Sequence, residues 1–142
     1  MMNVPSEEDW RSEGWNIDTP YAYRNFFGKT LTEAFDLFVE SSIYYKSDIM
    51  FMPLVCFRYY IHAYIDYLMS EKSAGDSDGA SCFFGLVEFR KDDIKASARD
   101  LQQRVAETLR HIAARQKWYD ADEFIYGDFA DRAIEALKQI EN

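Results

Sequence analysis

The chain has 142 residues, a length typical of one domain with a buried core of its own. Its net charge is −9, so the phosphate backbone of a nucleic acid would be repelled and nucleic-acid binding is disfavoured. The two cysteines, Cys56 and Cys82, form neither a metal motif nor a disulfide framework, and no apolar run is long enough to span a membrane.

Residues 1–27 are acidic and polar, with aromatic side chains scattered among them. Ser6 is a candidate helix cap, and Trp10 and Trp15 are expected to pin this stretch onto the rest of the chain. The predicted organisation is an irregular N-terminal arm over residues 1–27, packed on the body, and a helical domain over residues 28–142, one domain overall. The first ten residues lack the basic and apolar regions of a signal peptide, so we expect a cytoplasmic protein.

Two helices are expected between residues 30 and 71. Thr30 followed by Glu33 is a capping box, and the apolar residues behind it predict a helix of about four turns. Pro53 is tolerated in the first turn of a second helix, which is expected over residues 53–71. This second segment is aromatic over most of its circumference, and a helix of that kind is usually central in its domain.

Further helices are expected in the second half of the chain. A Gly, Asp and Ser cluster at residues 73–79 predicts a loop, with Ser77 or Asp78 as the cap of a short helix, although a strand is also compatible with the residues that follow. Residues 92–117 predict one long helix, and residues 118–129 predict a turn with aromatic anchors. Asp128 is expected to cap the last helix, whose inward-facing residues are expected to be Ala130, Ala133, Ile134 and Leu137. The fold class predicted is an all-α bundle of about five helices around the segment 53–71.

The candidate functional residues lie on the central helix. Arg58, His62 and Asp66 recur at intervals of four, so at 100° per residue they share one narrow stripe. The stripe is either a thin edge facing water, a buried polar brace whose charges are paired, or a ligand site with Tyr59 beside it.

Patterns for metal or catalytic chemistry are weak. His62 with Asp66, and Glu107 with His111, would supply two imidazoles and two carboxylates from two helices, but Glu107 and His111 are expected to point to solvent. The GDSDG stretch lacks the spacing of a calcium loop, and no nucleophile is paired with a base. We therefore predict no metal, no cofactor and no catalytic residue, and we favour a non-enzymatic protein without deciding the question.

The stretch FRYYIHAYIDY at residues 57–67 resembles a bacterial family of small, acidic, helical proteins of unknown function. The family signature is aromatic-Arg-aromatic-Tyr-Leu-Pro-Ala-Tyr, and the matching residues here are Phe57, Arg58, Tyr59, Tyr60, Ala63 and Tyr64. This chain has Ile61 and His62 where the family has Leu-Pro, which removes the helix kink that a proline would cause. The resemblance implies an all-helical bacterial protein and no activity.

The predicted function is that of a protein–protein interaction module, for instance an immunity-like or antitoxin-like protein that covers a basic partner. The acidic charge and the aromatic content of 17% favour this hypothesis. The alternative is a bundle that binds a small ligand or a metal through Arg58, His62 and Asp66. A homo-oligomer, in which the aromatic side chains form the subunit interface, is compatible with either hypothesis.

Overall fold

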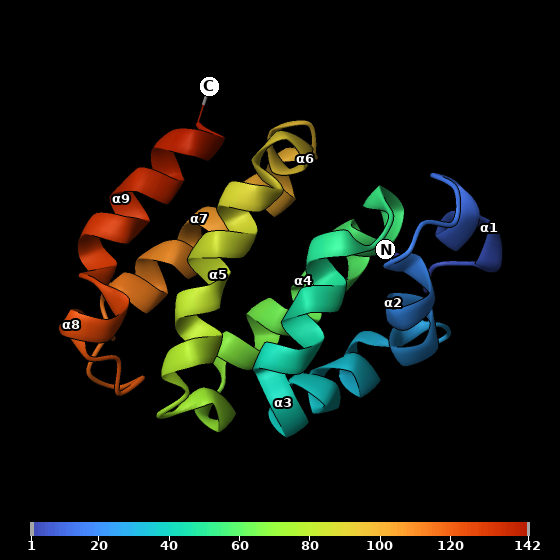
Figure 1. The fold of residues 1–142 in the computed structure, drawn as a ribbon. Coiled ribbons are helices and arrows are strands. Elements are labelled where there is room, and N and C mark those ends of the chain that lie inside the picture. Colours follow the sequence, from blue (N-terminus) through green and yellow to red (C-terminus); the bar gives the residue numbers. More distant parts are fainter. Residues whose placement is uncertain (1, 142) are drawn as a thin grey trace. The chain divides into compact units, whose positions relative to one another are not determined.

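The computed structural model describes residues 2–141, which form helices joined by loops and contain no β-strand (Figure 1). The predicted all-α fold is therefore confirmed. In chain order the helices are α1 (Glu7–Arg11), α2 (Thr19–Phe26), α3 (Leu31–Phe51), α4 (Leu54–Met69), the 3₁₀ helix η1 (Glu71–Ser73), α5 (Ser77–Phe89), α6 (Lys91–Lys95), α7 (Arg99–Ala113), α8 (Glu123–Tyr126) and α9 (Phe129–Ile140). The chain divides into two compact units, Met1–Asp66 and Tyr67–Asn142, and the boundary falls inside α4.

The first unit begins with the short helices α1 and α2. The Ser6 hydroxyl accepts a hydrogen bond from the main-chain N–H of Asp9, and the Asp9 carboxylate accepts one from the N–H of Ser6. The expected cap at Ser6 is thus present. Trp10 is completely buried, with its ring 5.7 Å from that of Tyr23 and 6.2 Å from that of Tyr60, so the rings join α1 to α2 and α4.

Helix α3 consists of two helical stretches that meet at Ser41. The first stretch begins with the expected capping box, in which Thr30 and Glu33 each accept a hydrogen bond from the other's main-chain N–H. At Ser41 the backbone is extended (φ −161°, ψ 94°), and its hydroxyl accepts from the N–H of Tyr44 at 3.4 Å. That is the behaviour of an N-cap residue, so the helix restarts there and continues to Phe51, beyond the four turns expected.

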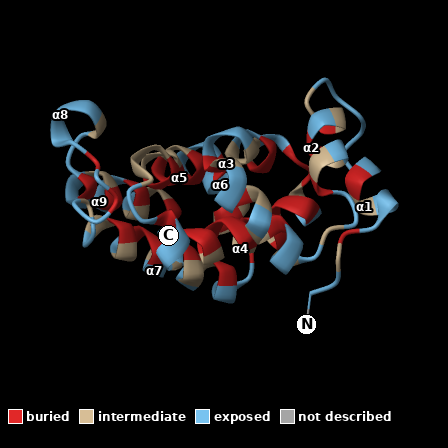
Figure 2. Cartoon of the chain, turned by 90° about the horizontal axis from the view of Figure 1, so that it is seen from below, coloured by how far each residue is buried: buried red, intermediate tan, exposed pale blue. Residues whose placement is uncertain are grey.

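Helix α4 contributes its aromatic side chains to the core (Figure 2). Tyr60 and Tyr64 are completely buried, and the ring of Tyr64 stacks on that of Phe38 with 5.0 Å between the centroids. The Tyr60 hydroxyl lies 2.7 Å from the carbonyl oxygen of Phe26 and 2.8 Å from that of Lys29. Many of the aromatic side chains are therefore buried, and the hydroxyl of buried Tyr60 donates to main-chain oxygens.

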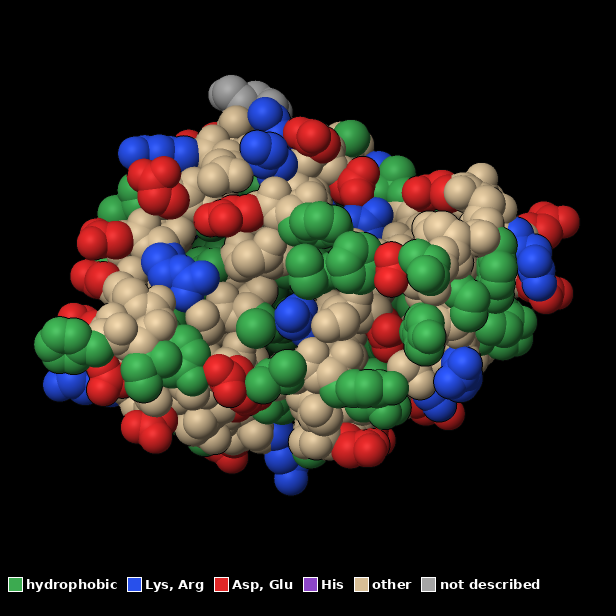
Figure 3. Space-filling view, in the orientation of Figure 1, with side chains coloured by type: hydrophobic (Ala, Val, Ile, Leu, Met, Phe, Trp, Pro, Cys, Tyr) green, Lys and Arg blue, Asp and Glu red, His purple; other side chains and the backbone are tan. Residues whose placement is uncertain are grey.

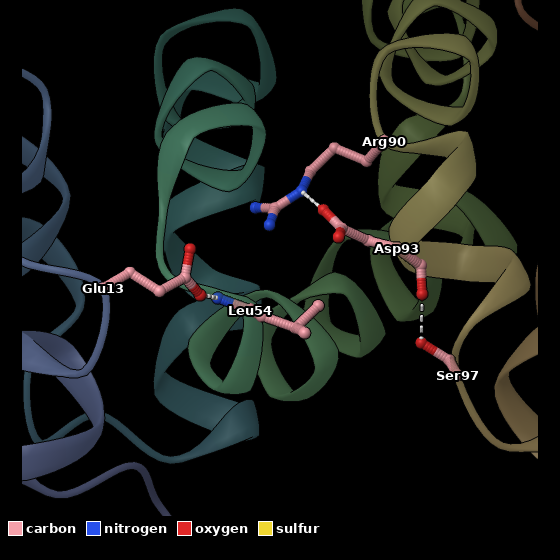
Figure 4. A network of polar contacts seen from close by, with 5 residues as sticks. All are labelled: Glu13, Leu54, Arg90, Asp93 and Ser97. Atoms are coloured by element: carbon pink, nitrogen blue, oxygen red, sulfur yellow. Dashed lines mark hydrogen bonds and ion pairs between the residues drawn. The ribbon is translucent and has the colours of Figure 1, made fainter.

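A side chain 41 positions earlier caps the start of α4. Pro53 precedes the helix and has no side-chain oxygen with which to cap it. The carboxylate of Glu13 instead accepts a hydrogen bond from the main-chain N–H of Leu54 (Figure 4). A negative charge at this position also complements the positive end of the helix dipole.

The second unit places a helix, not a strand, after the Gly, Asp and Ser cluster. The cap of α5 is Asp76, whose carboxylate accepts from the N–H of Gly79 at 3.0 Å and from the hydroxyl of Tyr67 at 2.7 Å. The expected caps, Ser77 and Asp78, are instead the first residues of the helix. Asp76 holds the capping position because its second oxygen is fixed by Tyr67, which no local pattern reveals.

The prediction of a single long helix over residues 92–117 is wrong. This segment contains two helices, α6 and α7, and Ala98 between them has an extended backbone and is exposed to solvent. The Ser97 hydroxyl donates to the carbonyl oxygen of Asp93 at 2.6 Å, and the Gln102 side chain donates to the carbonyl oxygens of Lys95 and Ser97, each at 2.9 Å. These bonds satisfy main-chain groups that a continuous helix would pair internally, so the break is stable.

The junction of α5 and α6 holds a buried arginine. The side chain of Arg90 donates from Nε to the carboxylate of Asp93 at 2.8 Å (Figure 4). Arg90 is only 7% exposed, and a buried guanidinium requires a partner of opposite charge. The pair fixes the turn between the two helices.

Helix α9 packs against α5, α6 and α7. The Asp128 carboxylate accepts from the N–H of Ala130 at 2.9 Å, which confirms the expected cap. The inward-facing residues are Phe129, Ala133, Ala136 and Ile140. The expectation that Ala130 and Ile134 face inward is wrong, because the burial of Phe129 against Phe84 (5.2 Å between ring centroids) sets the rotation of the helix.

Both cysteines are free thiols, Cys56 buried and Cys82 partly exposed. Among the helices of residues 2–141, none is both long and apolar enough to cross a membrane.

Candidate functional site

The polar stripe of α4 is a half-buried edge. Arg58, His62 and Asp66 are each partly exposed, and the residues at the two ends of the stripe, Val55 and Met69, are 44% and 38% exposed. The other residues of α4 that follow Val55 are all buried. The rotation of the helix is therefore the one that the sequence predicts.

Tyr59 is not part of this edge. It is 7% exposed, and its ring packs edge-on against that of Tyr60 with 4.8 Å between the centroids. The three residues of the stripe are thus kept on one side of α4 while the fourth candidate points into the core. The grooves described below are lined by other residues, and the use of Arg58, His62 and Asp66 as a ligand or metal site stays a prediction.

The two α7 side chains considered for a metal, Glu107 and His111, differ in exposure. Glu107 is exposed, whereas His111 is partly buried, and burial, together with the nearby Arg115, lowers the pKa of His111. Within residues 2–141 no group of three or more His, Cys, Asp or Glu side chains is arranged to hold a metal ion. In the GDSDG stretch, the Asp78 carboxylate accepts from the hydroxyl of Tyr126 at 2.7 Å, so this carboxylate helps to hold a distant loop.

The most exposed apolar side chains of the second unit lie on α8. Phe124 has the full exposure of a free side chain (101%), and Ile125 is 73% exposed. Residues 120–128, which we call the α8 tip, contain four acidic residues and no Lys, Arg or His: Asp120, Asp122, Glu123 and Asp128. Figure 3 shows green apolar side chains beside red carboxylates where Figure 1 places α8, and Figure 2 shows the helix as exposed.

Gln116 closes the base of the α8 tip. Its side-chain nitrogen donates to the carbonyl oxygens of Ala121 (3.0 Å) and Gly127 (2.8 Å), and its side-chain oxygen accepts from the N–H of Phe129 (2.9 Å). One amide side chain therefore ties both ends of the tip together. Gly127 has φ of 76°, a left-handed backbone that glycine adopts without strain.

A second set of bonds ties the α8 tip to α5 and α9. The Tyr126 hydroxyl donates to the carboxylate of Asp78 (2.7 Å) and accepts from the Ser77 hydroxyl (3.0 Å). The guanidinium of Arg132 donates to the Ser81 hydroxyl (2.7 Å) and to the carbonyl oxygen of Tyr126 (3.0 Å). The tip is thus held by helices on either side of it in sequence.

Two buried aromatic residues flank the α8 tip. Tyr119 is fully buried, and its hydroxyl donates to the carbonyl oxygen of Leu68 at 2.7 Å. Burial raises the pKa of Tyr119 to about 12. Phe129 is also fully buried, so the tip leaves and rejoins the core at fixed points.

A groove of about 790 Å³ lies beside the α8 tip. Its lining includes the ring of Trp118, which is 41% exposed, and the ring of Phe124. Aromatic side chains that are held in one conformation and exposed to solvent are typical of the central residues of protein interfaces. The lining carries three carboxylates, Asp122, Glu123 and Asp128, beside the basic side chains of Arg115 and Lys117. The excess of carboxylates favours a positively charged partner surface.

The sequence identified this segment only as a turn with aromatic anchors. Tyr119 and Phe129 are anchors, but Phe124 points to solvent. The signal that separates them is the acidic run Asp120, Asp122 and Glu123 directly before Phe124, because a helical turn that begins with several carboxylates is difficult to bury.

No family model, curated protein or solved structure matches the chain. The resemblance to the bacterial family of small acidic helical proteins stays a prediction.

Proposed function

We propose that this chain is a protein–protein interaction module whose α8 tip binds a basic partner protein. The single observation that carries the proposal is the full exposure of Phe124 on a loop that hydrogen bonds hold in place. An exposed ring has no stabilising role in the free chain, whereas a loop whose main chain is already held in place loses little backbone conformational entropy when it binds.

The charge of the α8 tip supports a basic partner. Four carboxylates and no cation lie within residues 120–128, and the whole chain carries −9. A surface of this sign attracts a basic protein over a distance and repels nucleic acid. A toxin covered by an immunity-like protein is one partner with this chemistry.

The test is quantitative capture from the source organism with three baits: the unchanged chain, the double variant Phe124→Ser with Ile125→Ser, and the control Ile134→Ser. Ile134 is on α9 in the second unit and is 52% exposed, so the control removes one exposed apolar side chain outside the α8 tip. We expect one basic protein that the unchanged chain and the control retain and that the double variant loses. Its affinity for the purified chain should fall as the salt concentration rises.

Capture of chaperones alone, or of a set of proteins that the double variant retains equally, would contradict the proposal. Light scattering on the purified chain measures its oligomeric state and tests whether the α8 tip binds a second copy of the chain. A dimer that the double variant converts to a monomer would assign the α8 tip to self-association and overturn the proposal of a different partner.

A further inference from the structure

The first unit contains an apolar groove between α2 and the second half of α3. Its volume is about 410 Å³, and it is open to solvent on one side. The lining residues are Asp18, Tyr21, Ile43, Tyr44, Ser47, Asp48 and Phe51. We call it the α2–α3 groove.

The restart of α3 at Ser41 creates one wall of the groove. In the stretch that follows, Ile43, Ser47 and Phe51 recur at intervals of four and share one face of the helix. Ile43 is 48% exposed and Phe51 is 42% exposed, on a face where a solvent-facing helix normally carries polar residues. The α2–α3 groove thus exposes apolar surface that the unit itself does not cover.

The lining also contains two tyrosine rings, one from each helix. Tyr21 on α2 is 56% exposed, and Tyr44 on α3 is 59% exposed with its ring held edge-on against Tyr45 at 4.9 Å. The guanidinium carbon of Arg24 lies 5.6 Å from the centroid of the Tyr21 ring. The ring of Tyr21 therefore already accepts a cation, as the electron-rich face of a tyrosine does in general.

The charged lining residues of the α2–α3 groove are both acidic, and the cation of Arg24 lies against the Tyr21 ring. Of its seven lining residues, Asp18 and Asp48 are acidic and none is basic. Asp48 is only 9% exposed, and one of its carboxylate oxygens accepts from the side-chain amide of Asn25 at 2.8 Å. Burial raises the pKa of Asp48, which the Asn25 hydrogen bond partly offsets. A cation in the groove would stabilise this poorly hydrated carboxylate.

We infer that the α2–α3 groove receives a lysine or arginine side chain of the basic partner, with the aliphatic stem against the apolar wall and the charged head near Asp18 and Asp48. Such side chains combine an apolar stem with a cation, and the lining offers an apolar surface for the stem and carboxylates for the cation. Because the groove is open, it encloses only part of its occupant, so a side chain that a partner protein presents fits it, and the same side chain on a small molecule is expected to bind weakly. The inference rests on the proposed function for the identity of the partner.

The test is a titration of the ¹⁵N-labelled full chain, followed by NMR, with two probes. Nα-acetyl-lysine methylamide carries the stem and the charge, and Nα-acetyl-norleucine methylamide carries the stem alone. We expect the lysine probe to shift the amide signals of Tyr44, Ser47 and Asp48 in a saturable way. The norleucine probe should bind at least about threefold more weakly, the effect of one partly exposed ion pair.

Two variants assign the binding to the carboxylates. Asp48→Asn removes the charge but keeps an oxygen that accepts from Asn25, and Asp18→Asn alters a helix-capping position whose side chain makes no capping bond. Each substitution should lower the affinity for the lysine probe at least about threefold. The control Asp36→Asn removes an exposed carboxylate from the first half of α3 and should leave the titration unchanged.

Equal shifts with both probes, or an unchanged titration in both variants, would overturn the inference. The titration needs no partner, so its failure is distinguishable from failure of the proposed function. A captured partner without lysine binding leaves the α8 tip proposal intact and overturns only the groove. Lysine binding without a captured partner would support the α2–α3 groove as a lysine site and would contradict the proposal for the α8 tip.

Discussion

The hydroxyl of Tyr119 donates to the main-chain carbonyl oxygen of Leu68, which lies 51 positions earlier in the chain (2.7 Å). That oxygen belongs to the last turn of α4, where carbonyl groups have no partner inside the helix. The Ser73 hydroxyl reaches the same oxygen at 3.0 Å. Two side chains from different parts of the second unit thus complete the end of α4 and fix the start of the segment that carries the α8 tip.

Removing the Tyr119 hydroxyl should destabilise the chain modestly. We expect Tyr119→Phe to lower the free energy of unfolding by about 1 kcal/mol, because a buried hydrogen bond is lost while the ring still fills its space. Urea unfolding measures the change, and Tyr44→Phe, at an exposed tyrosine, is the control. The double variant with Ser73→Ala should cost more than the sum of the single changes, since only then is the Leu68 oxygen left without either hydroxyl.

Alkaline pH should destabilise the chain through the same residue. The pKa of Tyr119 is about 12 in the folded protein, above the ordinary 10.0, so the unfolded state releases this proton first. The contribution is fully present below pH 10 and is lost as the pH rises toward about 12. Urea midpoints across this range should therefore fall more steeply for the unchanged chain than for Tyr119→Phe. Parallel curves for the two proteins would contradict the assignment.

Replacing Asp48 should stabilise the first unit at neutral pH. Its folded pKa lies above the ordinary 3.8, so its favourable contribution is present only below that pH and is lost as the pH rises through the folded pKa. Burial disfavours the ionised form of this carboxylate, and Asp48→Asn removes that cost. We expect a higher melting temperature for Asp48→Asn at pH 7 and a smaller difference near pH 3. A lower melting temperature at pH 7 would show that the charge itself stabilises the fold.

Loosening the α8 tip should weaken binding without removing any contact residue. Gln116→Leu deletes three hydrogen bonds that join Ala121, Gly127 and Phe129 while keeping a side chain of similar size. Hydrogen exchange of the amides in residues 121–127 should accelerate, and the partner affinity should fall because the tip must then be ordered on binding. The exchange of amides in α7 is the internal control. Faster exchange with unchanged affinity would argue against pre-ordering as the basis of recognition.

The rotation of α4 was predictable because it depends only on local geometry. A helix advances by 100° per residue, so the spacing of Arg58, His62 and Asp66 placed them on one edge whatever surrounds them. The capping box at Thr30 and the cap at Asp128 were predictable for the same reason, since each involves residues within one helical turn.

The errors share the opposite cause. The division of residues 92–117 depends on the Gln102 side chain reaching back to the carbonyl oxygens of Lys95 and Ser97, and the cap of α5 depends on Tyr67 fixing Asp76. Hydrophobic periodicity counts the positions of apolar residues and does not register such bonds. The apolar periodicity of residues 92–117 therefore continues across the break between α6 and α7.

By itself the sequence determined the all-helical class, the caps of α3 and α9 and the rotation of α4, because helix formation and amphipathic rotation arise from residues close in the chain. Only the tertiary structure decided which aromatic side chains are buried and which are exposed. Tyr119 and Phe124 are both aromatic residues of one short segment, but the ring of Tyr119 is buried near Leu68 and the ring of Phe124 is exposed to solvent. Burial is set by surfaces that distant segments bring together, and no local pattern contains that information.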